Sequence, residues 1–138
     1  MALKWLTQEM VLNLHKENMA EFGGDPSLRD RGLLESALER PRNLHAYGDA
    51  PSIHALAAAH CSGIVRNHPF VDGNKRAGIE AANAFLALNG LALQPSETEI
   101  VHVILALAAS ELDDDALADW IAENTAPVDD DTDGKPRK

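Results

Sequence analysis

The chain has 138 residues, 45% of them hydrophobic and 25% charged, which is the composition of a single globular domain. Twelve lysine and arginine residues stand against twenty-two aspartate and glutamate residues, and the formal net charge of −10 disfavours a protein that binds nucleic acid directly. The single cysteine excludes an internal disulfide, and because no apolar run reaches the ~18 residues that a membrane span needs, we expect a cytoplasmic protein without membrane contact.

The N-terminal third of the chain predicts two helices. Apolar residues recur at helical spacing after Thr7, a candidate N-cap, and the Gly23–Gly24 pair ends the run. Asp30 can cap a second helix. Because proline has no N–H and clashes with the preceding turn, we expect this helix to stop at Pro41 and residues 41–51 to form a loop.

Two longer helical patterns occupy the middle of the chain. The helix that begins after Ser52 carries apolar residues on nearly every side, so we expect it to be buried by its neighbours. It should end near Asn67, because Pro69 follows closely and the residue before a proline avoids the helical region. The next helix starts within the stretch HPFVDGNKRAG and ends at Gly90. This stretch therefore lies in a helix–loop–helix junction.

The C-terminal third predicts two further helices. Ser96 and Glu99 have the spacing of a capping box and open a helix that reaches about Ala109. The acidic cluster 113–115 favours a helix N-terminus, and the last helix continues to about Asn124. The stretch LALQ, just before the capping box, can form at most a short extended piece.

Five or six helices, few strand signals and no internal repeat predict an all-α fold. We expect residues 1–125 to form a single-domain helical bundle. Residues 126–138 lack periodicity and nearly all large apolar side chains, so we expect them to form a flexible polar tail.

The stretch HPFVDGNKRAG gathers positive charge inside an acidic chain. Residues 62–79 carry a net charge of +2, from the cations Arg66, Lys75 and Arg76 and the anion Asp72. If Asn74, Lys75 and Arg76 form the first turn of a helix, their backbone N–H groups have no acceptor within that helix. Gly73 has no Cβ to hold a phosphate away from these groups. The pattern therefore predicts a phosphate-binding helix N-terminus.

Two further side chains in the same stretch suit phosphate chemistry. A carboxylate together with phosphate oxygens is the usual way in which proteins hold Mg²⁺, so Asp72 is a candidate metal ligand. Histidine has an unperturbed pKa of about 6.5, so His68 can accept the proton of an attacking hydroxyl. These groups are the parts of a phosphoryl or nucleotidyl transfer site.

Each of these residues also has an ordinary structural explanation. A histidine before a proline often caps a helix, and DGNK is a common turn sequence. Phe70 and Val71 are expected to turn inward and fix the loop. A zinc site is disfavoured, because His54 and His60 are six residues apart and lack the i, i+4 spacing of paired ligands on a helix.

The nonamer HPFVDGNKR resembles the signature of the Fic/Doc superfamily, His-x-Phe-x-Asp/Glu-Gly-Asn-Gly/Lys-Arg, at every specified position. The segments LHKENMAEFGG, RDRGLLESAL and FLALNG are similar to segments of the death-on-curing (Doc) branch, so the resemblance extends over residues 4–124. It implies a Fic/Doc-type helical bundle in which the motif loop precedes a central helix. It also implies a toxin of a type II toxin–antitoxin system.

The resemblance implies a role for each motif residue. His68 would be the general base and Asp72 the ligand of Mg²⁺. The groups that hold the phosphates of ATP would be Gly73, Asn74, Lys75 and Arg76.

Two positions bear on which group is transferred. Most Fic proteins transfer AMP and have glycine at the position of Lys75 and a second arginine at that of Ile79. The Doc branch shares Asn-Lys-Arg and lacks that arginine, which implies a protein kinase that moves the γ-phosphate of ATP to a threonine of elongation factor Tu and so blocks translation. Gly73 matches the adenylylating members, so adenylyl transfer stays open, as does a non-catalytic domain of the same fold.

The resemblance also implies a regulatory partner. The sequence contains no Ser/Thr-x-x-x-Glu-Gly/Asn element of the kind with which many Fic proteins silence themselves. A separate, Phd-like antitoxin is therefore expected to neutralise the protein. The segment 41–51, with Arg40 and Arg42 at its start, stands where the family would have a target-docking flap.

Overall fold

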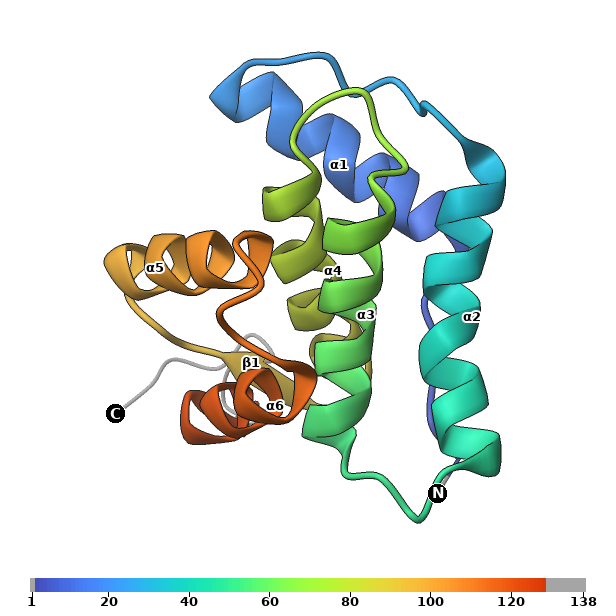
Figure 1. Ribbon diagram of the computed structural model, residues 1–138, viewed down its shortest axis with the longest axis vertical. Helices are drawn as coiled ribbons and strands as arrows, with labels where there is room; N and C mark the ends of the chain where they lie inside the picture. Colours follow the sequence, from blue (N-terminus) through green and yellow to red (C-terminus); the bar gives the residue numbers. More distant parts are fainter. Residues whose placement is uncertain (1, 129–138) are drawn as a thin grey trace.

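A computed structural model describes residues 2–128 as an all-α domain with one small sheet (Figure 1). Within these residues no helix is both long and apolar enough to cross a membrane. The elements are α1 (Gln8–Phe22), α2 (Arg31–Tyr47), α3 (Ile53–Asn67), α4 (Asn74–Leu88), β1 (Leu91–Leu93), α5 (Glu97–Ala108), α6 (Asp114–Glu123) and β2 (Thr125–Pro127).

The helix pair α3 and α4 forms the centre of the domain. The chain reverses between them, α2 lies on one side of the pair, and α5 and α6 lie on the other (Figure 1). All side chains of α3 from residue 56 to residue 65 are buried, which confirms the predicted central helix. The two helices approach closely, because a Cβ on Gly78 would lie 2.8 Å from the carbonyl oxygen of Cys61. Burial raises the pKa of the Cys61 thiol to about 12, as expected for a structural cysteine.

The predicted helix starts are confirmed by their caps. Five N-cap side chains accept a hydrogen bond from a backbone N–H of the first helical turn, and they are Thr7, Asp30, Ser52, Ser96 and Asp113. The capping box of Ser96 and Glu99 is complete. These bonds satisfy donors that a helix cannot pair internally.

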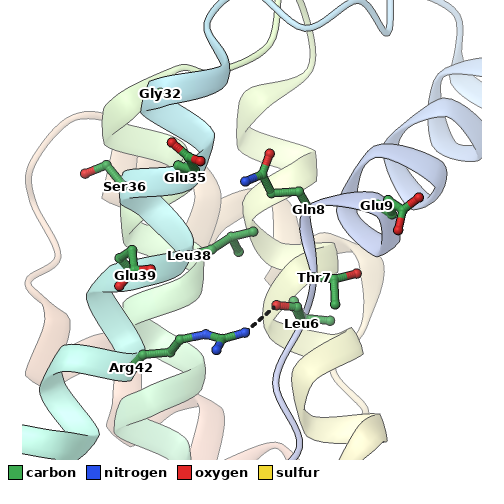
Figure 2. A pocket seen from close by; sticks show the side chains of 10 residues that line it. All are labelled: Leu6, Thr7, Gln8, Glu9, Gly32, Glu35, Ser36, Leu38, Glu39 and Arg42. Atoms are coloured by element: carbon green, nitrogen blue, oxygen red, sulfur yellow. Dashed lines mark hydrogen bonds between the residues drawn. The ribbon is translucent and has the colours of Figure 1, made fainter.

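The predicted end of the second helix at Pro41 is wrong, because α2 continues through it to Tyr47. Pro41 removes the N–H that would pair with the carbonyl of Ala37, and Gly63 of α3 lies against this carbonyl. Beyond the proline, Arg42 lies over the ring of Trp5 at 5.6 Å and donates to the carbonyl of Leu6 (Figure 2). Packing on both sides therefore keeps the segment helical, and the loop shrinks to residues 48–52.

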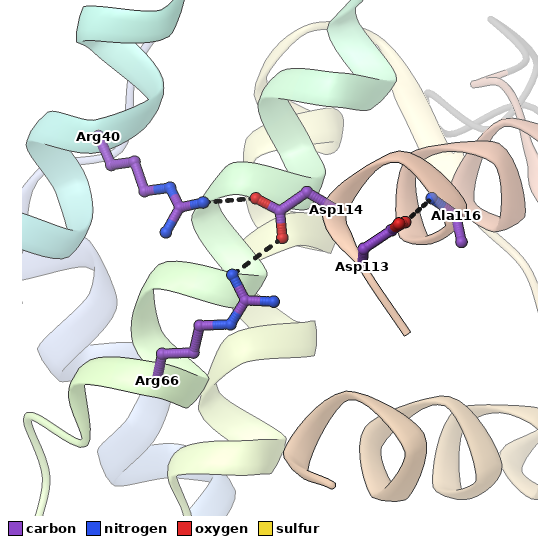
Figure 3. Close-up of polar contacts among 5 residues, drawn as sticks. All are labelled: Arg40, Arg66, Asp113, Asp114 and Ala116. Carbon is purple, nitrogen blue, oxygen red and sulfur yellow. Dashed lines mark hydrogen bonds and ion pairs between the residues drawn. The ribbon is translucent and has the colours of Figure 1, made fainter. Parts of the chain in front are cut away.

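The segment 41–51, where a target-docking flap was expected, is mostly not a loop, because residues 41–47 belong to α2. The loop that remains of it lies at the end of α3 opposite to the motif loop (Figure 1). Arg40 forms an ion pair with Asp114, and the same carboxylate lies 3.2 Å from Arg66 (Figure 3). Arg40 therefore joins α2 to the start of α6.

The small sheet corrects the predicted start of the tail. The stretch LALQ is extended, as expected, and Leu91–Leu93 pairs antiparallel with Thr125–Pro127. The N–H of Val128 donates to the carbonyl of Gly90 at 2.8 Å. Residues 126–128, predicted to belong to the tail, are thus attached to the domain, and residues 129–138 lie outside the described residues.

His60 is a titratable group at the centre of α3. Its ring is 1% exposed, lies 4.4 Å from the ring of Phe85, and donates from Nδ1 to the carbonyl of Leu56 at 2.8 Å. Burial lowers the pKa of His60 from 6.5 to about 4. The folded protein therefore holds this ring neutral at pH values where the unfolded chain protonates it.

We predict that the free energy of unfolding falls between pH 6.5 and about 4 because the unfolded chain takes up a proton on His60 that the folded chain excludes. The pKa difference corresponds to a loss of up to about 3 kcal/mol. Urea unfolding at several pH values should show a smaller loss in His60→Leu. His102→Gln, on the exposed face of α5, should behave as wild type; identical pH dependence in His60→Leu and wild type would contradict the prediction.

Candidate active site

The motif loop starts where α3 ends. His68 is the C-cap residue of α3 and has a left-handed backbone conformation (φ 52°). Its N–H donates to the carbonyl of Ile64 at 3.1 Å. Arg29 donates from Nε to the carbonyl of His68 at 2.8 Å and from a terminal nitrogen to Asn67 at 3.1 Å. The arginine thereby satisfies the last carbonyls of α3. The imidazole of His68 itself is exposed.

The segment before α2 holds the next part of the loop. The carbonyl of Pro69 accepts from the N–H groups of Arg29 and Asp30, and the N–H of Val71 donates to Ser27 at 2.9 Å. Successive side chains of such an extended pairing point to opposite sides. Phe70 is therefore 1% exposed, as predicted, whereas Val71 is 53% exposed, which corrects the expectation that both residues turn inward.

Asn74 closes the loop from inside. Its Oδ1 accepts from the N–H of Phe70 and its Nδ2 donates to the carbonyl of the same residue, both at 2.9 Å. These bonds fix the orientation of the amide, whose Nδ2 also lies 3.3 Å from Nδ1 of His68. Because Nδ2 can only donate, Nδ1 is the acceptor, and the neutral ring carries its hydrogen on Nε2. Nδ1 is thus the ring atom that can take up a proton.

The N-terminus of α4 differs from those of the other described helices. Its N-cap is Gly73, in a left-handed conformation (φ 76°), and no side chain bonds to the first turn. The N–H groups of Asn74, Lys75 and Arg76 therefore face the motif loop without a capping side chain, and the helix dipole favours an anion there.

Gly73 is required for a reason that the sequence pattern did not indicate. The pattern suggested that the missing Cβ makes room for phosphate. A Cβ at this position would instead lie 2.6 Å from Cε of Met19 and 2.8 Å from Cε1 of His15, both in α1. The glycine lets α1 pack against the turn, and its positive φ adds a second reason.

Five of the six predicted site residues line one cavity of about 290 Å³: His68, Asp72, Gly73, Asn74 and Lys75, with Val71 as a further lining residue. A cavity of about 770 Å³ lies between the N-terminal segment and α2 (Figure 2). Its lining includes Glu9, Glu35 and Glu39. Three carboxylates repel a phosphate, so the cavity at the motif loop is the better candidate for an anion site.

Asp72 suits a metal ion that arrives with phosphate. The Asp72 side chain is exposed at the cavity, and Oδ1 accepts from the N–H of Gly73 at 3.0 Å. Within residues 2–128, no three His, Cys, Asp or Glu side chains gather to hold a metal ion on their own. A single carboxylate completed by phosphate oxygens and water is a common donor set for Mg²⁺. The residues present therefore fit Mg²⁺ bound together with a nucleotide.

Arg76, the sixth predicted site residue, does not line this cavity. Its guanidinium lies 2.6 Å from a carboxylate oxygen of Glu97 and 3.9 Å from one of Glu80, and it stacks over the ring of Phe22 at 4.9 Å. Burial raises the pKa of the Glu80 carboxyl, and the charge of Arg76 opposes that rise. In this structure Arg76 joins α4 to α5 and α1.

His15 contacts the site, although the sequence analysis did not single it out. Its Nε2–H donates to the carbonyl of Asp72 at 2.8 Å, and its ring lies 4.0 Å from that of Phe70. Burial lowers the pKa of His15, although the hydrogen bond to Asp72 and the charge of Asp72 oppose this. The sequence did contain a signal for this role. His15 lies one helical turn after Val11 and one turn before Met19, so it is a polar residue on the buried face of α1.

The cavity brings together a histidine, a carboxylate and an uncapped helix N-terminus within a helical bundle. This arrangement is typical of proteins that bind phosphate and act on it. The sequence model of the Fic/DOC family matches residues 5–86, and the chain belongs to this family. It is 27% identical over 119 residues to the protein kinase doc of Escherichia phage P1, which covers 86% of this chain and 94% of that protein.

A second relative is the toxin Doc of Mycolicibacterium smegmatis. The two chains are 42% identical over 73 residues, which is 52% of this chain and 56% of that protein. With the phage relative aligned over nearly its whole length, the chain is a Doc-type member of the Fic/DOC family.

We predict that Asn74→Ala destabilises the protein by about 2 kcal/mol, because the N–H and carbonyl of buried Phe70 lose their only side-chain partner within the described residues. Urea unfolding measures the loss. Asn13→Ala, on the exposed face of α1, should change the free energy of unfolding by less than about 0.5 kcal/mol. An equal effect of the two substitutions would show that the Asn74 amide does not close the loop.

Proposed function

We propose that the protein is a toxin kinase that transfers the γ-phosphate of ATP to a hydroxyl of a protein target, a threonine of elongation factor Tu, and so stops translation. The observation that carries this proposal is the single cavity shared by His68, Asp72 and the first turn of α4. The kinase name of the phage relative supports the reaction type.

Lys75 and Ile79 support phosphoryl over adenylyl transfer. Lys75 lines the cavity with its side chain exposed, at the position where adenylylating members have glycine. Ile79 is buried in the core, at the position where those members have a second arginine. A buried isoleucine offers no contact to a triphosphate, so this chain lacks one group on which adenylyl transfer depends.

In the proposed reaction, the N–H groups at the start of α4 and the Lys75 ammonium hold the phosphates, and the Asp72 carboxylate supplies a ligand for Mg²⁺. Bound Mg²⁺ neutralises charge on the phosphate oxygens. The target oxygen bonds to the γ-phosphorus while the bond from that phosphorus to the bridging oxygen of ADP breaks. The hydroxyl proton passes to Nδ1 of His68, displacing its 3.3 Å contact with Asn74.

The proposal includes a neutralising partner and a cytoplasmic location. The sequence lacks the self-silencing element of many Fic proteins, so an active toxin needs a separate inhibitor, and we propose a Phd-like antitoxin. The target, elongation factor Tu, works in the cytoplasm, and the predicted absence of a membrane segment is in line with this.

We predict that the protein labels elongation factor Tu when incubated with Mg²⁺ and ATP carrying a label on the γ-phosphate, and does not label it from the α-phosphate. His68→Ala should slow labelling by roughly 100-fold or more, because it removes the proton acceptor. Quantified radioactivity in the purified target gives the rate. Label from the α-phosphate would show that the protein is an adenylyltransferase and not a kinase.

His102→Ala, remote from the motif loop, is the matched control for this experiment and should keep the wild-type rate. Expression in bacteria adds an independent readout, since the wild-type protein should stop growth and His68→Ala should not. Equal growth of both strains, with no label from either phosphate, would identify a non-catalytic domain of the same fold.

Arg76 can hold phosphate only after it leaves Glu97. The Glu97 side chain is 64% exposed, so the ion pair is weak. We predict that Glu97→Gln lowers the Kd for MgATP by roughly two- to fivefold, since exposed pairs contribute up to about 1 kcal/mol. Calorimetric titration measures the change. Glu111→Gln removes the same charge from an exposed position and should leave Kd unchanged; equal effects would mean that only net charge matters.

A further inference from the structure

His15 is a polar side chain in a place where an apolar one would be the ordinary choice. It is 1% exposed, between Val11 and Met19 on the buried face of α1. Within residues 2–128 nothing hydrogen bonds to its Nδ1 atom, which is also buried. A buried unpaired nitrogen destabilises a fold. Stability alone therefore does not account for a histidine at this position.

The other side of the ring contacts the motif loop. Nε2–H donates to the carbonyl of Asp72 at 2.8 Å, and the ring centroid lies 4.0 Å from that of Phe70. The Cε1 atom lies 2.8 Å from the place that a Cβ of Gly73 would occupy. His15 thus touches three of the four residues from 70 to 73.

The bond to Asp72 has no substitute in the described structure. The segment before α2 holds Pro69 and Val71 through backbone hydrogen bonds, and Asn74 holds Phe70. Among residues 2–128, His15 provides the one hydrogen bond to the backbone of Asp72 from outside the motif loop. The direction of the Asp72 carboxylate depends on that backbone.

We propose that His15 is a positioning residue, which aims the Asp72 carboxylate and the Gly73 turn at the metal-bound phosphates without touching the reacting atoms. This inference rests on the proposed function, because it assumes that the cavity takes a nucleotide with its divalent ion. Loss of a group that orients a metal ligand through a hydrogen bond typically weakens metal binding 10- to 100-fold.

The test compares His15→Leu, His15→Gln and Val11→Ala in the full chain. Mn²⁺ replaces Mg²⁺, and the enhancement of water-proton relaxation on titrating Mn²⁺·ATP with protein reports binding, at a temperature where circular dichroism shows every variant folded. His15→Leu should bind at least about tenfold more weakly. His15→Gln, whose amide N–H can reach the same carbonyl, should recover most of the affinity.

Stability separates positioning from simple packing. His15→Leu removes the unpaired Nδ1, so its Tm should be unchanged or higher although its affinity falls. Val11→Ala opens space in the same face of α1, so its Tm should fall although its affinity stays at the wild-type value. Wild-type affinity in His15→Leu, or equally weak binding in the Leu and Gln variants, would overturn the proposal.

A second measurement distinguishes failure of this inference from failure of the proposed function. The ¹⁵N–¹H NMR signal of the Gly73 amide, recorded without nucleotide, should shift in His15→Leu and return toward its wild-type position in His15→Gln. An unshifted signal overturns the positioning role directly. If the wild-type protein binds no Mn²⁺·ATP, the nucleotide site itself is wrong, and the metal-aiming role of His15 is overturned with it.

Discussion

One side-chain amide closes the reversal of the chain between α3 and α4, and the candidate site depends on it. Asn74 pairs with both backbone groups of Phe70, and it reaches them because His68 and Gly73 take left-handed conformations at the two ends of the loop. This closure leaves Asp72 at the tip. A histidine, a carboxylate and a helix N-terminus therefore meet in one cavity.

The electrostatics of the site come largely from the backbone. Five of the six described helices use a side chain to cap their first N–H groups, whereas α4 leaves these groups at the cavity. Arg76 is drawn away by Glu97 and Glu80, so Lys75 is the one cationic side chain that lines the cavity within the described residues. An acidic chain can thus attract phosphate locally, because the helix dipole and one ammonium act at short range.

The helices were predictable where their ends depend on near neighbours. Ser96 and Glu99 lie three residues apart and bond to each other's backbone, so the pattern sufficed to predict the start of α5. The predicted helix end at Pro41 was wrong, because packing against Trp5 and α3 keeps α2 helical beyond the proline. Strand β2 was missed because its partner lies more than thirty residues away, beyond the reach of local periodicity.

The motif residues and the helices that flank them could be predicted from the sequence, because both depend on residues a few positions apart. The directions of the side chains could not be predicted, because they depend on contacts between distant segments. Val71 turns outward, Arg76 turns to α5, and His15 reaches Asp72 across 57 positions of sequence. The direction of a side chain is set by whatever packs against it, and in a folded chain those neighbours come from distant segments.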